Sequence, residues 1–427
     1  MNILVSRPVC GLVQINIRRN KLRIDQASSG VEKMAFGPNL MPEGRALPEK
    51  DDESLRLGRV AACLADSFQF QAPDCPGLAF VGGLADPGLI GLTGKSVRLS
   101  VAGSGLTPAD AETRCLGEAA ERISCLAAVH QPGEPVALAE IPDDLRALLG
   151  DVSGPVPCLQ GQRLSDGDAV WVPVNLCLHD PAAGPPPVAR GTAAGSTWPA
   201  AVKRAVAEVV ERDAAALWWL GGRHAPPVSL EAASTASDVL TALRGRADTR
   251  TTWLLDLGRE FGISTFAAVS VLPSGEGFAC GLRAAPAVAD AIRNALIEMA
   301  QMELSQHLIR GKAKALGSDA LTPADRRQIE RSVRITPENC PLIVPVGGPR
   351  PSGRGPISSP GETIQSLCEV SNLYSVDLTR PSLDIPVAAI LAPRLQPLDP
   401  ASSTPRLRAA CEQTGGGDQY HGGQSLL

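Results

Sequence analysis

Two copies of the pattern Arg-x-x-x-Glu-x-x-Glu-Arg lie about ninety residues apart in the sequence. The first consists of Arg114, Glu118, Glu121 and Arg122, and the second of Arg204, Glu208, Glu211 and Arg212. Residues three and four apart share one side of a helix, so each copy places two carboxylates and flanking guanidiniums in a single stripe. Four carboxylates brought together in this way would suit magnesium ions and the phosphates bound to them.

A charged stripe can also be only the solvated face of a helix. In each copy the first glutamate and the last arginine have the (i, i+4) order that supports an exposed helix by roughly 0.2–0.5 kcal/mol. The first arginine of each copy precedes a glutamate by four residues, and this order stabilises a helix less than the reverse order does. Helix stability alone therefore does not explain the arginine. A third segment carries Asn294, Glu298 and Gln301 at the same spacing. The repetition favours a shared site.

Apolar periodicity predicts the helices that carry these stripes. One should begin near Thr107, which Pro108 and Asp110 follow as in a helix N-terminus. A second should follow Ser196 or Thr197, and a third should run from about Pro286 to Arg310. Strands are predicted over residues 78–83, 96–102, 170–178, 252–257, 263–272, 277–283, 372–378 and 385–392. Strands interleaved with long helices predict an α/β or α+β layered fold.

Segments rich in small residues are predicted to be turns and loops. Gly103 and Gly105 precede the first helix, and GTAAGST (191–197) precedes the second. A Gly/Pro-rich segment, 347–362, carries Arg350 and Arg354. It is either a surface loop or a lid whose arginines reach phosphate.

Three regions follow from this pattern. Residues 1–76 form an N-terminal region of unclear fold, with a strand expected at its start and an apolar-periodic piece over 55–65, and this region could contact a partner or peptide. Residues 77–397 carry all three polar stripes and are predicted to form the domain that holds the site. The Gly-rich residues 398–427 are predicted to be a disordered tail.

Composition excludes several classes of protein. The net charge of −5 and the absence of a basic run argue against a nucleic-acid-binding surface. No apolar run approaches the eighteen or so residues of a membrane span, and Arg7 and Pro8 interrupt any signal-peptide core. The chain is therefore predicted to be cytoplasmic. Its 11 cysteines include no C-x-x-C pair, so we expect reduced, buried thiols.

Other catalytic motifs are absent from the sequence. The five histidines do not cluster with a Ser or Cys in a recognisable order. There is no G-x-x-x-x-G-K-[ST] loop, and no G-x-G-x-x-G follows a strand and opens a helix. If ATP binds, acidic helices would hold it in place of a phosphate-binding loop.

Four segments resemble, in the same order, the signatures of the YcaO superfamily. They are AGSGLTPADAETRCLGEAAER (102–122), ARGTAAGSTWPAAVKRAVAEVVERDA (189–214), AIRNALIEMAQ (291–301) and VDLTRPSLDIPVAAILAP (376–393). Together they span about residues 78 to 395. The ERDA ending of the second segment and the VDLTRP strand are fairly specific in this combination.

The resemblance implies a fold in which glutamates from several helices hold ATP and Mg²⁺. Such enzymes phosphorylate or otherwise activate a peptide-backbone amide oxygen, which a neighbouring nucleophile then displaces. By this resemblance Glu118, Glu121, Glu208 and Glu211 would bind metal and nucleotide. Arg122 and Arg212 would bind or support the nucleotide, and Glu298 and Gln301 would be catalytic.

The chain departs from the family pattern at several positions. Many members have Ser at the position of Arg114, Asn at those of Arg190 and Ser196, and Lys at that of Ser104. Azoline-forming members often end in Pro-x-Pro-x-Pro, which this chain lacks. These differences leave three functions open.

The favoured function is azoline-forming cyclodehydration of Cys, Ser or Thr in a ribosomally made precursor peptide. The alternatives are backbone thioamidation with a TfuA-like partner and a non-catalytic scaffold. We expect a separate leader-peptide-binding protein, unless residues 1–76 supply that function, and a homodimer stays open.

Overall fold

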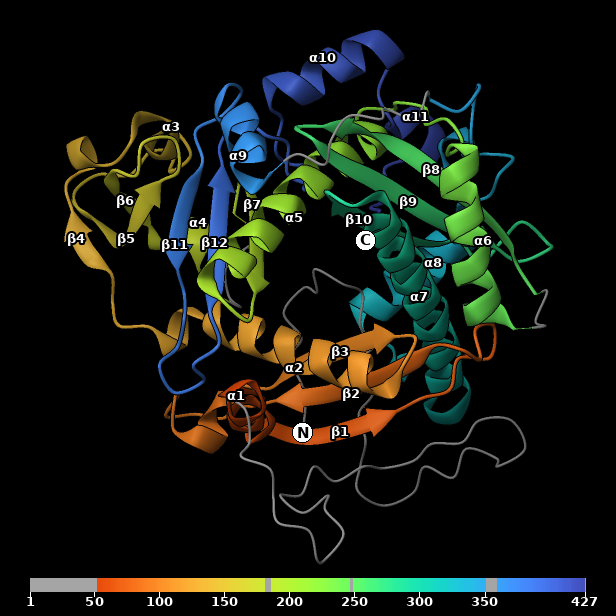
Figure 1. Cartoon of the computed structure of the whole chain (residues 1–427), viewed down its shortest axis with the longest axis horizontal. Helices are drawn as coiled ribbons and strands as arrows, with labels where there is room; N and C mark the ends of the chain where they lie inside the picture. The colour runs from red at the N-terminus through yellow and green to blue at the C-terminus, as the bar shows by residue number, and fades with distance from the viewer. Residues whose placement is uncertain (1–51, 181–185, 246–248, 351–358, 427) are drawn as a thin grey trace, which may run out of the picture.

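The computed structural model describes residues 52–180, 186–245, 249–350 and 359–426. These residues form three antiparallel sheets covered by helices (Figure 1). The first sheet has the order β1-β2-β3 and the second β10-β9-β8; the third has the order β4-β5-β11-β12-β7, with β6 paired to β5. The predicted layered mixture of helices and sheets is confirmed.

The first two sheets each come from one stretch of the chain, and the third combines two stretches. The first sheet consists of β1 (Leu64–Gln69), β2 (Ala79–Ala85) and β3 (Leu99–Gly105), and the second of β8 (Thr251–Glu260), β9 (Ile263–Val271) and β10 (Ala279–Ala285). The third contains β4 (Glu134–Val136), β5 (Val156–Arg163), β6 (Ala169–Pro173), β7 (Ala189–Ala194), β11 (Tyr374–Asp377) and β12 (Val387–Ala392).

One long helix follows a strand of each sheet. These helices are α2 (Pro108–Ser124) after β3, α5 (Trp198–Trp219) after β7 and α7 (Val288–Leu316) after β10. Each packs on the strand that precedes it, and the three helices lie on three sides of the middle of the molecule (Figure 1). The Thr107 and Thr197 side chains cap α2 and α5 by accepting a hydrogen bond from a backbone N–H of the first turn.

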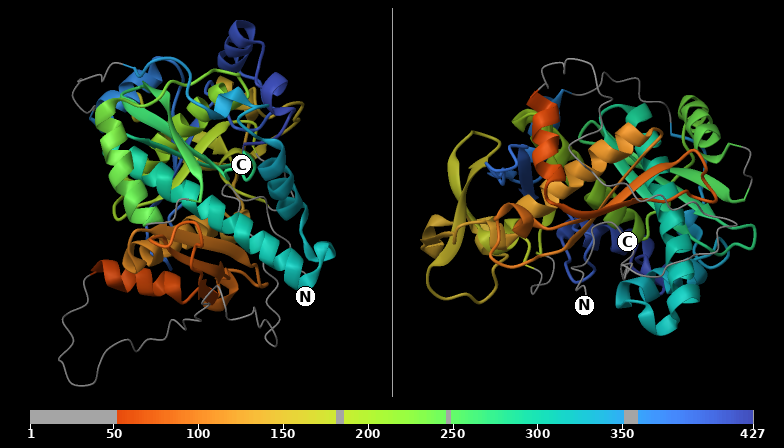
Figure 2. Two further views of the ribbon diagram at one scale, coloured as in Figure 1. Left: turned by 90° about the vertical axis from the view of Figure 1, so that its right-hand side faces the viewer. Right: turned by 90° about the horizontal axis from the view of Figure 1, so that it is seen from below.

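The remaining helices surround this arrangement. They are α1 (Asp52–Ala61), α3 (Asp143–Arg146), α4 (Val174–Cys177), α6 (Leu230–Arg244), α8 (Pro323–Arg334), α9 (Pro360–Cys368), α10 (Pro405–Thr414) and α11 (Asp418–His421). Side views show α1 and the first sheet together at one side of the molecule (Figure 2). Within the described residues, no helix has both the length and the apolar character needed to cross a bilayer.

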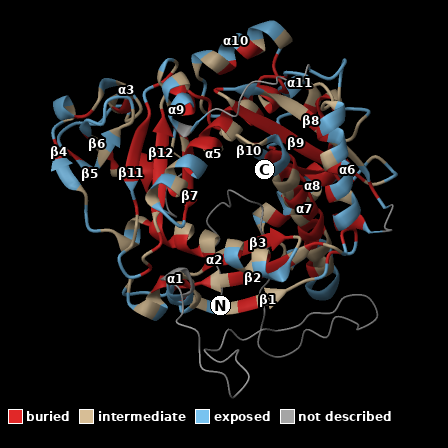
Figure 3. Ribbon diagram, viewed as in Figure 1, coloured by how far each residue is buried: buried red, intermediate tan, exposed pale blue. Residues whose placement is uncertain are grey.

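The core lies between the sheets and the three long helices. Every residue of β9 and β12 is buried (Figure 3). The burial on both faces explains why β12 reads as a continuous apolar run. The 10 cysteines in the described residues are free thiols and most are buried, as expected. Cys10 and the strand expected at the start of the chain lie outside the described residues.

The glycines predicted to form turns lie instead in strands. Gly103 and Gly105 are in β3, and Gly191 is in β7. A Cβ atom on Gly103 would lie 2.0 Å from the Ala111 carbonyl oxygen of α2, and one on Gly191 would lie 2.0 Å from that of Ala205 on α5. The glycines therefore permit the close approach of strand to helix, which a sequence pattern cannot distinguish from a turn.

The two ends of the described chain differ from their predicted organisation. Strand β1 pairs with β2, so the first sheet continues across the boundary expected at residue 76. The segment predicted to be a disordered tail contains α10 and α11 and buries Leu407, His421 and Leu426. Thr404 caps α10, and the apolar side chains pack inward, which offsets the flexibility of the glycines.

A third difference concerns residues 170–178, expected to form one strand. Strand β6 ends at Pro173 and the single-turn helix α4 follows it.

Substitution of Gly103 by Ala tests the close contact of β3 with α2. The added methyl group would overlap backbone atoms that cannot rotate away, so we expect a loss of about 1–3 kcal/mol in the free energy of unfolding. Gly117→Ala is the matched control on α2, since no atom lies within 4 Å of its added Cβ; it should stabilise by about 0.5–1 kcal/mol. Urea unfolding that gave equal values for both variants would contradict this packing.

Candidate active site

One glutamate on each long helix accepts a hydrogen bond from the backbone of the preceding strand. The bonds run from the N–H of Ala102 to Glu118 (2.9 Å), of Thr192 to Glu208 (2.9 Å) and of Leu282 to Glu298 (3.2 Å). In all three, donor and acceptor are 16 residues apart in the chain. The same strand-to-helix unit thus occurs three times.

The residue three positions further along each helix points toward another unit. Glu211 of α5 accepts from the N–H of Ala284 on β10 (2.8 Å), and Gln301 of α7 accepts from the Ser104 hydroxyl on β3 (2.6 Å). Glu121 of α2 lies within electrostatic range of Glu208 on α5. The three units therefore follow one another in a ring, and the predicted glutamates and glutamine come together at its centre.

Arg122 and Arg212 pair with the glutamate one turn earlier on their own helices. Arg122 donates to Glu118 at 3.5 Å and to the Ser100 carbonyl at 2.7 Å, and Arg212 donates to Glu208. The Glu118 and Glu208 side chains keep 25% and 21% of their surface exposed. Arg122 and Arg212 thus fix the Glu118 and Glu208 carboxylates, and the exposed part of each carboxylate remains accessible to a ligand from solvent.

Burial and mutual repulsion raise the pKa of three of these carboxyl groups. Burial raises the pKa of Glu118, opposed by Arg122. Burial raises the pKa of Glu121 well above its ordinary value, and the Glu208 and Glu118 carboxylates raise it further. Burial likewise raises the pKa of Glu211 to about 8, against the opposing charge of Arg283. The positive charges of Arg122, Arg212 and Arg283 therefore compensate the carboxylates only in part, as expected of a site that receives cations.

The donor set fits magnesium bound together with a phosphate ligand. In the described part of the chain, no three His, Cys, Asp or Glu side chains form a ready-made metal cage. Magnesium usually takes one or two carboxylates and completes its shell with water and substrate phosphates. Pairs of glutamates from neighbouring helices, with oxygen atoms only, meet that requirement.

The leading residue of each stripe lies one turn before the first glutamate. Arg114 donates to the Asn294 side-chain oxygen at 2.8 Å and so links α2 to α7. Arg204 donates to the Ala194 carbonyl at 3.1 Å. Arg190, also unusual for the family pattern, donates to the Cys177 carbonyl at 3.0 Å and ties β7 to α4.

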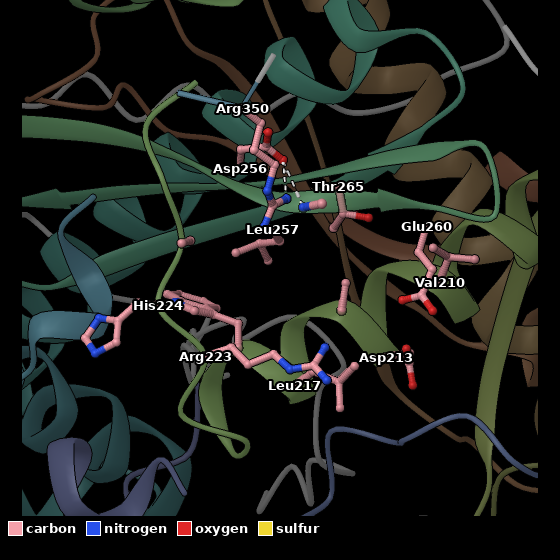
Figure 4. Close-up of a pocket in the computed structure, with 14 residues that line it drawn as sticks. Val210, Asp213, Leu217, Arg223, His224, Asp256, Leu257, Glu260, Thr265 and Arg350 are labelled. Atoms are coloured by element: carbon pink, nitrogen blue, oxygen red, sulfur yellow. Dashed lines mark hydrogen bonds and ion pairs between the residues drawn. The ribbon is translucent and has the colours of Figure 1, made fainter. Parts of the chain in front are cut away.

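Arg350 does not lie at the ring of glutamates. It pairs with Asp256 at 3.1 Å and lines a small pocket on another face of α5, formed there by Val210, Asp213 and Leu217 (Figure 4). The pocket has a volume of about 120 Å³, below the several hundred Å³ of typical ligand sites. The other arginine of that loop, Arg354, lies outside the described residues.

The backbone donors of the site were not predicted. The N–H groups of Ala102, Thr192, Leu282 and Ala284 hold the carboxylates, and their side chains take no part in these hydrogen bonds. Ser104 was noted only as a departure from the family pattern. The constant spacing between each small-residue segment and the glutamate that follows it was the sequence feature that could have revealed these backbone donors.

A comparison with known protein families shows to which family the chain belongs. The profile described as "YcaO cyclodehydratase, ATP- and Mg²⁺-binding" matches residues 102–396. The chain belongs to the YcaO family. ATP and Mg²⁺, the predicted ligands, are therefore those of its family. No curated protein sequence matches the chain.

Solved YcaO-type structures share the fold. A heterocyclase in complex with substrate and cofactor has a TM-score of 0.61 and 18% identity, covering 83% of this chain. This chain spans 52% of that heterocyclase. YcaO from Methanopyrus kandleri, bound with AMPPCP and Mg²⁺, has a TM-score of 0.59 and 20% identity over 80% of this chain and 88% of its own.

A third similar structure belongs to a multi-protein assembly. A chain of the E. coli microcin synthetase McbBCD complex has a TM-score of 0.56 and 13% identity over 74% of this chain and 84% of its own. At these identities the similarity establishes the fold.

Glu211→Gln tests the electrostatics of the ligand-free site. The folded-state pKa of about 8 exceeds the ordinary 4.5, so the contribution of Glu211 to stability is fully present below pH 4.5 and is lost as the pH rises toward 8. Between these values the stability of the variant relative to wild type should rise by up to roughly 1.4 kcal/mol per pH unit. Denaturant unfolding with a chelator present measures this difference.

The exposed Glu412→Gln serves as the control and should show no such trend. Parallel stability curves for wild type and Glu211→Gln would contradict the burial of this carboxyl group.

Proposed function

We propose that this chain uses ATP and Mg²⁺ to activate a backbone amide oxygen of a ribosomally made precursor peptide by phosphorylation, and that it forms azolines. The observation that carries this proposal is the ring of glutamates contributed by three helices. The family description supports ATP-dependent cyclodehydration in general. The precursor-peptide substrate and the azoline product are our proposal and are not part of that family description.

Four glutamates would hold the metal ions and, through them, the nucleotide. Glu121 on α2 interacts electrostatically with Glu208 on α5 and with Glu118, and Glu211 interacts with Glu208. Bound magnesium would neutralise the charge on the phosphates during transfer. Arg122 and Arg212 would keep Glu118 and Glu208 oriented and add positive charge beside the phosphates.

Glu298 and Gln301 would act on the peptide. Gln301 accepts from Ser104 with its side-chain oxygen, so its NH₂ group would donate to the amide oxygen of the substrate. Glu298, held by the Leu282 N–H beside Glu211, would take the proton of the attacking Cys, Ser or Thr. The nucleophile would form a bond to the amide carbon, the amide nitrogen would lose its proton as the C=N bond forms, and the phosphorylated oxygen would leave as phosphate. The peptide would thus lose one water in total.

Partner proteins form part of the proposal. The solved McbBCD complex contains several proteins, and one such structure has pro-MccB17 bound. By analogy, a leader-peptide-binding partner would deliver the precursor to this chain. A homodimer is the other arrangement in the proposal.

Thioamidation with a TfuA-like partner is the second candidate. Both reactions share amide activation and differ in the nucleophile. A scaffold without turnover is the third candidate, motivated by the departures from the family pattern at Arg114, Arg190 and Ser196.

Peptide-stimulated phosphate release tests the enzyme against the scaffold. The precursor should be taken from a short Cys/Ser-rich reading frame beside the gene. Wild type should release phosphate from ATP, and Glu211→Gln should lower the rate by about 10²-fold or more, because a carboxylate beside the transferred phosphate is removed. Glu412→Gln, an exposed change on α10, should retain the wild-type rate.

Mass spectrometry of the peptide then separates the products. Loss of one water for each modified residue indicates azoline, whereas exchange of oxygen for sulfur indicates thioamide. Absence of phosphate release with any candidate precursor would contradict the enzymatic proposal.

A further inference from the structure

The three strand-to-helix units meet at three junctions, and two of these carry pairs of carboxylates. Between α5 and α7, Glu211 accepts from the N–H of Ala284 at 2.8 Å and interacts electrostatically with Glu298. Between α2 and α5, Glu121 interacts electrostatically with Glu208. Carboxylate oxygens attract cations, so these two junctions suit the metal ions and, through them, the nucleotide.

The third junction, between α7 and the first unit, is built from amide, hydroxyl and guanidinium groups. Gln301 of α7 stands where the other two long helices carry a glutamate, and its side-chain oxygen accepts from the Ser104 hydroxyl of β3 at 2.6 Å. Two turns earlier on α7, the Asn294 side-chain oxygen accepts from Arg114 of α2 at 2.8 Å. We call these four residues the α2–α7 junction.

Both contacts leave hydrogen-bond donors of the junction free for a ligand. The Gln301 oxygen is used by Ser104, and among the residues that the structure describes none accepts from the Gln301 NH₂ group. Arg114 uses its Nη2 atom on Asn294, and no described residue accepts from its Nε or Nη1 atom. The Asn294 amide is fixed in turn, since its NH₂ group donates to the Asp290 carbonyl at 2.7 Å. Arg114 and Gln301 are partly exposed, so a ligand can reach them.

The spacing of the two anchors matches an extended peptide. Asn294 and Gln301 are seven positions apart in the sequence and so lie on one face of α7. A helix rises about 1.5 Å per residue, which places the anchors about 10 Å apart. An extended chain rises about 3.3 Å per residue, so that distance corresponds to about three residues of peptide. Its carbonyl oxygens are neutral acceptors, which suit donors and gain nothing from carboxylates.

Backbone carbonyls are also the acceptors that neighbouring arginines use. Arg204 donates to the Ala194 carbonyl at 3.1 Å, and Arg190 donates to the Cys177 carbonyl at 3.0 Å. A carbonyl of a bound peptide would give Arg114 the same kind of partner.

We propose that the α2–α7 junction binds the precursor peptide as an extended backbone, with Gln301 on the amide oxygen that is activated and Arg114 on the carbonyl oxygen about three residues away. This inference rests on the proposed function and adds to it the place and register of the peptide. The contact from Arg114 would distinguish this chain from the many family members with Ser at that position.

Steady-state kinetics with modified precursors tests the register. In a set of synthetic precursors, one backbone amide at a time, two, three or four residues on either side of the modified residue, is replaced by a carbon–carbon double bond. This replacement keeps the chain length and removes the carbonyl oxygen. The KM for each peptide is measured at saturating ATP, and the Kd for ATP with Mg²⁺ is measured by calorimetry without peptide.

The protein variants separate contact with the peptide from support of the fold. Arg114→Ser removes the guanidinium group, whereas Asn294→Ala removes its anchor and keeps the group itself. Arg408→Ser on α10 is the control, since Arg408 is also an arginine that donates to a carbonyl, that of Ser403. It should leave both constants unchanged.

Arg114→Ser should raise the KM for the unmodified precursor about tenfold or more, because a hydrogen bond from a charged donor is lost, and should change the Kd for ATP by less than about threefold. Loss of the carbonyl three residues away, on one side only, should raise the wild-type KM by a similar factor. The two changes together should cost no more than either alone, since they remove the same contact. Asn294→Ala should raise the KM less and stay sensitive to that carbonyl.

Two results would overturn the inference and leave ATP-dependent amide activation standing. One is an Arg114→Ser variant whose effects add to those of every modified peptide, which would indicate a role in support of the fold. The other is a loss of ATP affinity as large as the loss for the peptide. A wild-type chain that releases no phosphate with any candidate precursor would overturn the proposed function and this inference together.

Discussion

The structure depends on holding several glutamate side chains close together at the centre of the molecule. Like charges in a half-buried position repel each other and lose hydration, so the arrangement needs compensation. The fold supplies part of it through a backbone N–H on each preceding strand, repeated in all three strand-to-helix units. Arg122 and Arg212 supply another part. The raised pKa values of Glu121 and Glu211 show that the compensation is incomplete, and divalent cations with a nucleotide would complete it.

Much of the rest of the fold follows from this requirement. The backbone of a strand can reach a glutamate on the following helix only if the two elements pack closely. Gly103, Gly191 and Gly281 make that approach possible, since a Cβ at any of them would lie within 2.2 Å of a helix carbonyl oxygen. Strands β9 and β12 are buried along their whole length, so the helices that carry the carboxylates rest on packed elements of the core.

The sequence predicted the parts of this structure that depend on side-chain chemistry and periodicity. The stripes on α2, α5 and α7, their helical state and the family were found because charged residues and apolar spacing report them directly. The strand role of Gly103 and Gly191 was missed, because glycine is equally typical of turns and of close packing. Helices α10 and α11 were missed because their stability comes from packing against α5, and local glycines concealed it. The link from Arg114 to Asn294 joins residues 180 positions apart, a contact that only the fold reveals.

The most direct test of the central claim is a crystal structure of the protein with AMPPCP and Mn²⁺ in place of Mg²⁺, with the ions located by anomalous scattering. The account predicts ions between Glu121 and Glu208 and beside Glu211, with the triphosphate next to them. Anomalous peaks at other carboxylates, or a nucleotide bound away from α2, α5 and α7, would contradict it.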